Sequence, residues 1–170
     1  NGRRAAAEQA LRDALVAVDP AAHADRAAAH ARAARWYSGA LCHPGETLAQ
    51  AQRALAELDR VAEPDRVLVS SALALGAWGA AVVGRVAVSD ELLRRMAEID
   101  LDVDDPDVRC ELANAHAFRA LAEGKLDEAA EHFESIAGAP GIAPDRAYGV
   151  RINLACMLAA QSRYADALRC

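Results

Sequence analysis

The stretch Gly124-Lys125-Leu126-Asp127-Glu128-Ala129-Ala130-Glu131-His132-Phe133 decides how this chain of 170 residues folds. Gly124 separates two helix-like runs, and Ala129 and Phe133 lie one turn apart on the run that follows it. Ala117 is a small residue midway along the run before the glycine. Small residues let two helices cross closely, and an aromatic side chain fills the gap beside the crossing. The pattern predicts helices over 107–123 and 126–137 that form an antiparallel hairpin.

The rest of the chain repeats this organisation. Proline recurs at Pro20, Pro64, Pro106 and Pro144, spaced by 44, 42 and 38 residues, and the last three are each followed by Asp. Proline is tolerated in the first helical turn, where Asp suits the positive end of the helix dipole, and a period of this size indicates a repeat array. We therefore expect one all-α domain over 1–170, an α-solenoid of about four antiparallel helix hairpins with the last incomplete.

The expected units are a leading helix in 1–19 and repeats over 20–62, 63–104, 105–142 and 143–170. The expected helices cover 3–18, 22–40, 46–60, 65–84, 90–100, 107–123, 126–137, 145–161 and 164–170. Ser89 or Asp90 is the expected cap of the helix over 90–100. The chain begins without Met and ends within a helix-like run, so we expect it to be a fragment of a larger protein.

The spacing of Ala117, Gly124, Ala129 and Phe133 resembles that of a tetratricopeptide repeat. The fourth hairpin is similar, since Asn153-Leu154-Ala155 leads to Ser162-Arg163-Tyr164-Ala165-Asp166-Ala167. The first two hairpins depart from the pattern, the second through a longer and apolar first helix. The spacings of 38 to 44 residues exceed the usual ~34, and another kind of α-solenoid is the alternative. The resemblance implies a stack in which the first helix of each hairpin lines a concave face.

This repeat frame assigns a set of residues to a partner-binding concave face. They are Trp36, Arg85, Glu111, Asn114, Phe118, Leu121, Ile152 and Asn153. Repeats that grip carboxylates need Lys, Arg and Asn there, whereas most of these positions here are Ala, Leu or Cys. We expect an apolar groove that suits a helix or an extended apolar segment. The alternative interpretation is that Trp36 and Phe118 are simply core residues.

Composition excludes several classes of function. The net charge is −6, and there is no Lys/Arg-rich run of the kind that neutralises phosphates, so we expect no direct nucleic-acid binding. Residues 67–84 carry no charge, a length at the threshold for a membrane span. We favour a buried central helix, in which Gly76, Gly79 and Gly84 permit close helix contact, and expect no membrane association. The four cysteines form no C-x-x-C pair and indicate reduced, buried thiols in a cytoplasmic protein, with Cys170 as the one that could be exposed.

An acidic run is the one pattern typical of a cation site. Asp100-Leu101-Asp102-Val103-Asp104-Asp105 gives D-x-D-x-D, and Glu111 is twelfth from Asp100, as in a calcium loop. Asp105 stands where that loop needs Gly, and Pro106 starts a helix too early, so a solvated acidic loop is favoured. The histidines and cysteines show no metal-ligand spacing, and the chain contains no phosphate loop or nucleophile elbow. We expect no metal, no cofactor and no catalytic residue, and hence no enzyme.

These observations favour a protein–protein interaction or scaffold module. Irregular repeats rich in Ala and Arg resemble the sensor regions of large bacterial ATP-binding transcriptional regulators, including LuxR-type and antibiotic-pathway activators. The expected partner is a protein or peptide, or other domains of the same parent chain, and exposed end helices favour a homodimer. The alternative is a sensing domain in which a small molecule or peptide fills the groove and shifts a switch.

Overall fold

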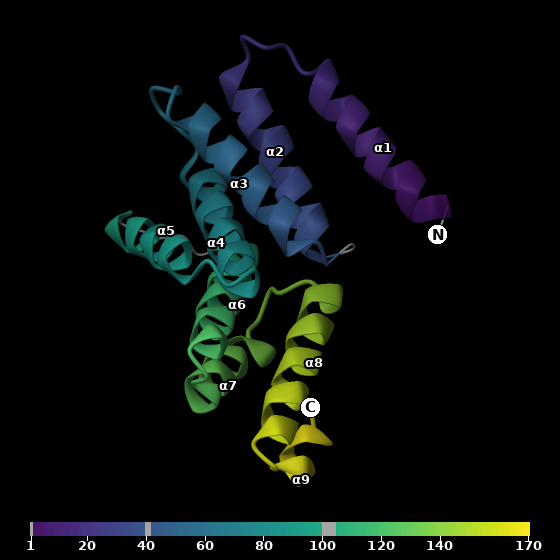
Figure 1. The fold of residues 1–170 in the computed structure, drawn as a ribbon, viewed down its shortest axis with the longest axis vertical. Coiled ribbons are helices and arrows are strands. Elements are labelled where there is room, and N and C mark those ends of the chain that lie inside the picture. The colour runs from purple at the N-terminus through teal and green to yellow at the C-terminus, as the bar shows by residue number, and fades with distance from the viewer. Residues whose placement is uncertain (1, 40–41, 100–104) are drawn as a thin grey trace.

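The computed structural model describes residues 2–39, 42–99 and 105–170, which form nine helices and no strand. The helices are α1 (Gly2–Ala17), α2 (His23–Gly39), α3 (Pro44–Leu58), α4 (Arg66–Val82), α5 (Val86–Glu98), α6 (Pro106–Ala122), α7 (Leu126–Ala137), α8 (Pro144–Ala160) and α9 (Tyr164–Ala167). Figure 1 shows them following one another from α1 at one end to α8 and α9 at the other. Sequential helices pack in pairs, α2 with α3, α4 with α5, α6 with α7 and α8 with α9, which confirms the all-α prediction and the pairing.

Three hairpin turns share one backbone geometry. Gly84, Gly124 and Ser162 adopt positive φ values of 76°, 76° and 62°. The amide of the next residue donates to the carbonyl five positions back in each turn, at 2.8, 3.0 and 2.8 Å for Arg85, Lys125 and Arg163. This bond and the left-handed residue before it are those of a Schellman helix ending. The three turns give a common register in which α4, α6 and α8 can be compared position by position.

Helix α4 lies at the centre of the stack, against α2, α3, α5 and α6. Its crossing with α3 is close, because a Cβ on Gly79 would lie 2.7 Å from the Pro44 carbonyl oxygen. Gly76 also faces a neighbouring side chain, Leu92 of α5. The expectation for Gly84 was wrong: it contacts no other helix and instead forms the hairpin turn. The uncharged segment is thus a buried helix, and the described helices include none with the length and hydropathy of a membrane span.

Two large apolar clusters form most of the core and meet at α6, and a third, small cluster consists of Ala34, Ala51 and Leu75. The first joins α2 to α6 around Leu48, Leu73 and Met96. The second joins α6, α7 and α8 around Phe133 and Val150. Alanine fills both clusters, and it lets helices approach closely at little entropic cost. The apolar core therefore follows the stack from one hairpin to the next.

Helix starts differ from the predictions in detail. Asp65 and Asp105 cap α4 and α6, each accepting two backbone N–H bonds through its carboxylate. Pro64 therefore precedes its helix rather than opening it. Neither Ser89 nor Asp90 caps α5, which begins at Val86. Ser89 is buried inside that helix, where its hydroxyl donates to the Ala77 carbonyl at 3.0 Å and ties α5 to α4.

The prediction of buried cysteines was right for Cys110 and wrong for Cys42 and Cys156. Only Cys110 is buried, whereas Cys42, Cys156 and Cys170 are exposed. Cys42 lies in the connection after α2 with a positive φ of 49°, not inside a helix. Cys156 lies on an exposed side of α8. Periodicity alone could not separate a covered helix face from an open one.

Candidate functional site

The predicted concave-face residues fall into two groups in the structure. Four lie along one side of α6, with Glu111 buried and Asn114, Phe118 and Leu121 half-buried. The remaining four are distributed over the other hairpins: Trp36 is half-buried on α2, Arg85 is exposed in the turn after α4, and Ile152 and Asn153 lie on α8. The structure therefore brings together the α6 residues but does not gather Trp36 and Arg85 with them.

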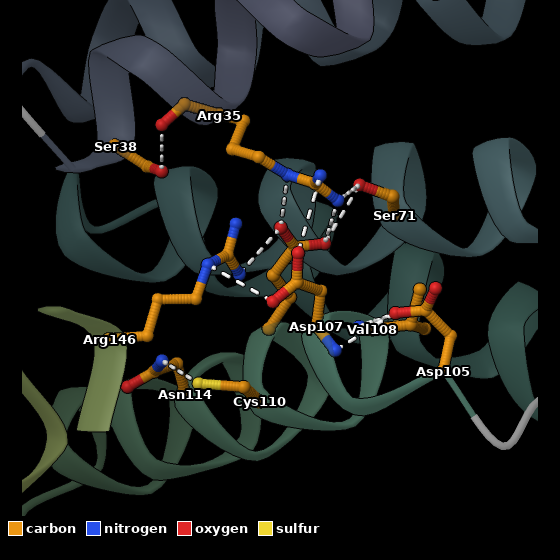
Figure 2. A network of polar contacts seen from close by, with 10 residues as sticks. Arg35, Ser38, Ser71, Asp105, Asp107, Val108, Cys110, Asn114 and Arg146 are labelled. Carbon is orange, nitrogen blue, oxygen red and sulfur yellow. Dashed lines mark hydrogen bonds and ion pairs between the residues drawn. The ribbon is translucent and has the colours of Figure 1, made fainter. Parts of the chain in front are cut away.

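Glu111 already has partners within the chain. Arg35 Nε lies 2.8 Å from its Oε1, Arg146 Nη1 lies 3.1 Å from the same oxygen, and the Ser71 hydroxyl donates to Oε2 at 2.7 Å. Figure 2 shows Arg35, Ser71 and Arg146 converging from three different helices. Because α2, α4, α6 and α8 each contribute a group, this carboxylate ties together the first helices of four hairpins. We call this set of four residues the Glu111 network.

Asp107 completes the charge balance around the network. It lies 3.4 Å from Arg146 Nε and 3.7 Å from Arg35 Nη1, so two carboxylates face two guanidinium groups. Burial opposes the charged form of Arg146, but the charges of Glu111 and Asp107 outweigh it and raise the pKa of the guanidinium. The site is electrically neutral and internally satisfied. It is therefore a structural joint rather than a clamp for an anionic ligand.

Cys110 lies beside this network, and its thiol is buried. Burial raises the pKa of its thiol, and the negative charges of Glu111 and Asp107 add to that effect against the lowering by Arg146. The thiolate is the nucleophilic form of cysteine. Burial and the raised pKa both disfavour the thiolate form of Cys110.

Aromatic rings connect the two core clusters through Phe118. Its ring packs edge-on against Trp78 of α4 and against Phe133 of α7, with both centroid distances 5.9 Å. Trp36 packs in the same way against Tyr37, at 5.8 Å. Phe118 is thus anchored in the core on one side while it keeps part of its surface open to solvent. A ring in that position can contribute both to packing and to a partner contact.

Helix α8 carries an apolar stripe that sequence reasoning found only in part. Tyr148 is 66% exposed and Ile152 46% exposed, and Cys156 is exposed one turn further on. The spacing of four places all three on one side of the helix. We call these three residues the α8 stripe. Tyr148 was missed, although its position four residues before Ile152 is a signal that could have identified it.

A separate cleft of about 890 Å³ lies between α1 and the α2–α3 hairpin. Glu8 and Arg12 of α1 face Gln50 and Arg53 of α3 across it, and Figure 1 shows α1 set apart from the hairpin. On its floor, His30 lies 2.8 Å from Gln50 Oε1. Acidic and basic side chains both line the cleft, so a ligand with positively and negatively charged groups could form ion pairs there.

Histidines and acidic residues do not assemble a metal centre in the part of the chain that the structure describes. His116 and His132 stack with centroids 5.1 Å apart between α6 and α7. Most of the acidic run considered for calcium, residues 100–104, lies outside the described residues. Its last positions are Asp105, which caps α6, and Glu111, which is held in its own network.

Taken together, these features define an all-α protein of stacked helical hairpins with an internal ionic joint and an open apolar stripe on its last long helix. Comparison with known proteins adds no family, because no family model, no curated protein and no solved structure matches the chain.

Proposed function

We propose that this chain is a tetratricopeptide-like module that binds a helix or peptide of a partner protein on the inner face of its first helices. Three hairpin turns of the same geometry support the repeat assignment. The small and aromatic residues of the repeat pattern support it too, because Ala117, Ala129 and Phe133 are fully buried. On that face Asn114 and Phe118 of α6 are half-buried, and Ile152 of α8 is 46% exposed.

The observation that carries the proposal is the exposed α8 stripe, together with the half-buried Asn114, Phe118 and Leu121 of α6. Fully burying a side chain such as Ile contributes roughly 1.5–3 kcal/mol relative to leaving it exposed. Tyr and Ile side chains left open on one helix face therefore favour association with an apolar surface. The Glu111 network supports the proposal indirectly, since it fixes the relative positions of the first helices before a partner arrives.

We infer the biological setting from the resemblance to the sensor regions of bacterial transcriptional regulators. The Ala- and Arg-rich irregular repeats favour the sensor or scaffold part of a bacterial transcriptional regulator of the LuxR or antibiotic-pathway type. In that setting the partner is a signalling protein or another domain of the parent chain. Self-association through the open helix faces is a further prediction, which light scattering at increasing concentration tests.

Affinity capture from a bacterial lysate, read by mass spectrometry, tests the proposal with matched variants. Ile152→Glu places a charge in the α8 stripe, and Val83→Glu places the same charge on a residue of similar exposure, 42%, at the end of α4. We expect the native chain and Val83→Glu to capture the same partner and Ile152→Glu to lose it. Equal capture by all three proteins would refute binding at this face, provided that circular dichroism shows all three folded.

The cleft beside α1 favours a second candidate, a sensor of a small molecule or peptide. Its volume of about 890 Å³ lies within the range of ligand pockets, and residues of both charges line it. A ligand at 100 times its Kd would stabilise the fold by about 2.7 kcal/mol. A dose-dependent rise in Tm with a metabolite, abolished by Arg53→Ala, would establish sensing, whereas no rise across a metabolite panel would count against it.

A further inference from the structure

A second cavity, of about 290 Å³, lies within the α6–α7 hairpin, and we call it the α6–α7 pocket. Its lining residues are Arg109, Leu112, Ala113 and His116 of α6, His132, Ser135 and Ile136 of α7, and Ala139. The spacing of three and four residues places the α6 members on one side of that helix. At 100° per residue, this side is opposite to the one that carries Glu111 and Phe118. The pocket is therefore separate from the inner face and from the cleft beside α1.

Apolar side chains line the middle of the pocket, and basic groups lie toward its two ends. Leu112 and Ile136 contribute apolar surface from the two helices. Arg109 lies two turns before His116, so their Cα atoms are about 10 Å apart along the helix axis. An apolar lining with a few polar groups is the usual composition of a small-molecule site, and this volume suits a small ligand.

Two histidines form one end of the pocket. The rings of His116 and His132 stack with centroids 5.1 Å apart and planes at 21°. Both side chains are half-buried, and neither ring has a hydrogen-bond partner among the described residues. A neutral imidazole carries one N–H donor and an imidazolium carries two. The pocket therefore holds donors that the surrounding chain does not use.

The charges around the histidine pair favour an anion. Burial and the charge of His132 lower the pKa of His116, and Glu128 of α7 opposes them without lining the pocket. Helix α4 carries no charge beyond its first residue, and Asp90 of α5 is held by Arg119 of α6. The described lining residues include no Asp or Glu, although the net charge of the chain is −6. An anion in the pocket would supply the counter-charge that the imidazolium forms lack.

We propose that the α6–α7 pocket binds a small carboxylate with a short apolar chain. The carboxylate accepts hydrogen bonds from the imidazoles of His116 and His132, and the apolar chain lies over Leu112 and Ile136 toward Arg109. Hydrogen bonds from a charged donor to a carboxylate are the stronger kind, so binding tightens when the histidines are protonated. This inference goes beyond the proposed partner-binding face and does not depend on it.

NMR of the histidine ring protons in the full chain tests the proposal, with hexanoate as the probe. The chain has five histidines, of which His23 and His30 bond to Glu57 and Gln50 and serve as internal references. We expect hexanoate to shift the resonances of His116 and His132 and to leave those of His23 and His30 in place. The Kd at pH 5.5 should be about tenfold lower than at pH 8, as when an anion raises the pKa of one histidine by about 1.

Matched ligands and variants assign the contacts. Hexylammonium has the same chain with the opposite charge and is expected not to bind, and acetate lacks the chain and is expected to bind more weakly. Arg109→Gln should weaken hexanoate binding by up to about fivefold, the size of an exposed ion pair. Arg66→Gln, an exposed arginine on α4 outside the pocket, should leave binding unchanged. A chain with both His116→Gln and His132→Gln should lose the pH dependence, and circular dichroism checks that each variant is folded.

Four outcomes would overturn the proposal, and the first three need only the native chain. Unshifted His116 and His132 resonances at millimolar hexanoate and pH 5.5 exclude the site. Equal binding of hexylammonium rejects the carboxylate, and equal binding of acetate rejects the apolar chain. Shifts of all five histidines in parallel show non-specific binding. A Kd in the double histidine variant that changes with pH as in the native chain rejects the role of the imidazoles.

Discussion

Replacing Glu111 by alanine removes the carboxylate that joins four hairpins. Arg35 and Arg146 then lose their buried ion-pair partner. Breaking a buried ion pair by removing one partner costs about 3–5 kcal/mol. Here the side chains of Arg35 and Arg146 remain 38% and 21% exposed, so both can turn toward water once the carboxylate is lost. That relief lowers the expected loss to about 2–3 kcal/mol in the free energy of unfolding. For a chain of this length the fall in Tm is about 5–10 °C.

Urea unfolding followed by circular dichroism measures this loss, and fluorescence of Trp36 and Trp78 tests whether the hairpins unfold together. Glu111→Gln, which keeps an acceptor for Ser71 but no charge, is expected to lose less than Glu111→Ala. Arg94→Ala is the matched surface control, because Arg94 pairs with Glu91 and Glu98 on the exposed side of α5 and such pairs contribute at most about 1 kcal/mol. A loss for Glu111→Ala no larger than that for Arg94→Ala would refute the structural role of the network.

Three further predictions follow from the backbone and from one histidine. Gly79→Val is expected to lower the free energy of unfolding by at least about 1–3 kcal/mol through overpacking, since even a Cβ at this position would lie 2.7 Å from the Pro44 carbonyl oxygen. An unchanged free energy of unfolding in urea would contradict the close crossing of α3 and α4. Ser162 and Gly124 both have positive φ, which glycine adopts without strain. Ser162→Gly is therefore expected to raise the free energy of unfolding and Gly124→Ala to lower it, each by about 1 kcal/mol. The same urea unfolding curves measure both changes. Burial and the charge of His132, opposed by Glu128, lower the pKa of His116. As the pH drops, His116 therefore binds a proton in the unfolded chain before it does so in the folded chain, and the free energy of unfolding falls below about pH 6.5. Between pH 8 and pH 5, the Tm of His116→Gln should fall less than the Tm of the native chain.

Local signals were sufficient to predict most of the hairpins. Gly124 supplies the left-handed residue of its turn, and the paired periodicities of 107–123 and 126–137 agree with α6 and α7 within a residue. The start of α5 was misplaced because Ser89 has the chemistry of a cap but uses its hydroxyl to bond α4 instead. A capping preference is a weak signal where a buried hydrogen bond to another helix is available.

The ionic joint could not be predicted, because its partners are distant in the sequence. Arg35 lies 76 residues before Glu111, and Arg146 lies 35 residues after it. The repeat frame placed Glu111 on the inner side of its helix, but only the packing of α2 and α8 supplies the arginines that satisfy it. The role of Phe118, as a core residue or as a residue that contacts a partner, likewise depends on distant residues. Its ring packs against Trp78 of α4 and Phe133 of α7.

The central claim is that a partner binds the inner face at α8, and hydrogen exchange of the captured complex tests it most directly. Amides of a helix that is open on one side exchange through local opening, which a docked partner suppresses. We predict slower exchange across α8 and the facing part of α6 on partner binding, with α3 and α5 unchanged. Protection confined to α1, α2 and α3 would contradict the claim and assign recognition to the cleft beside α1.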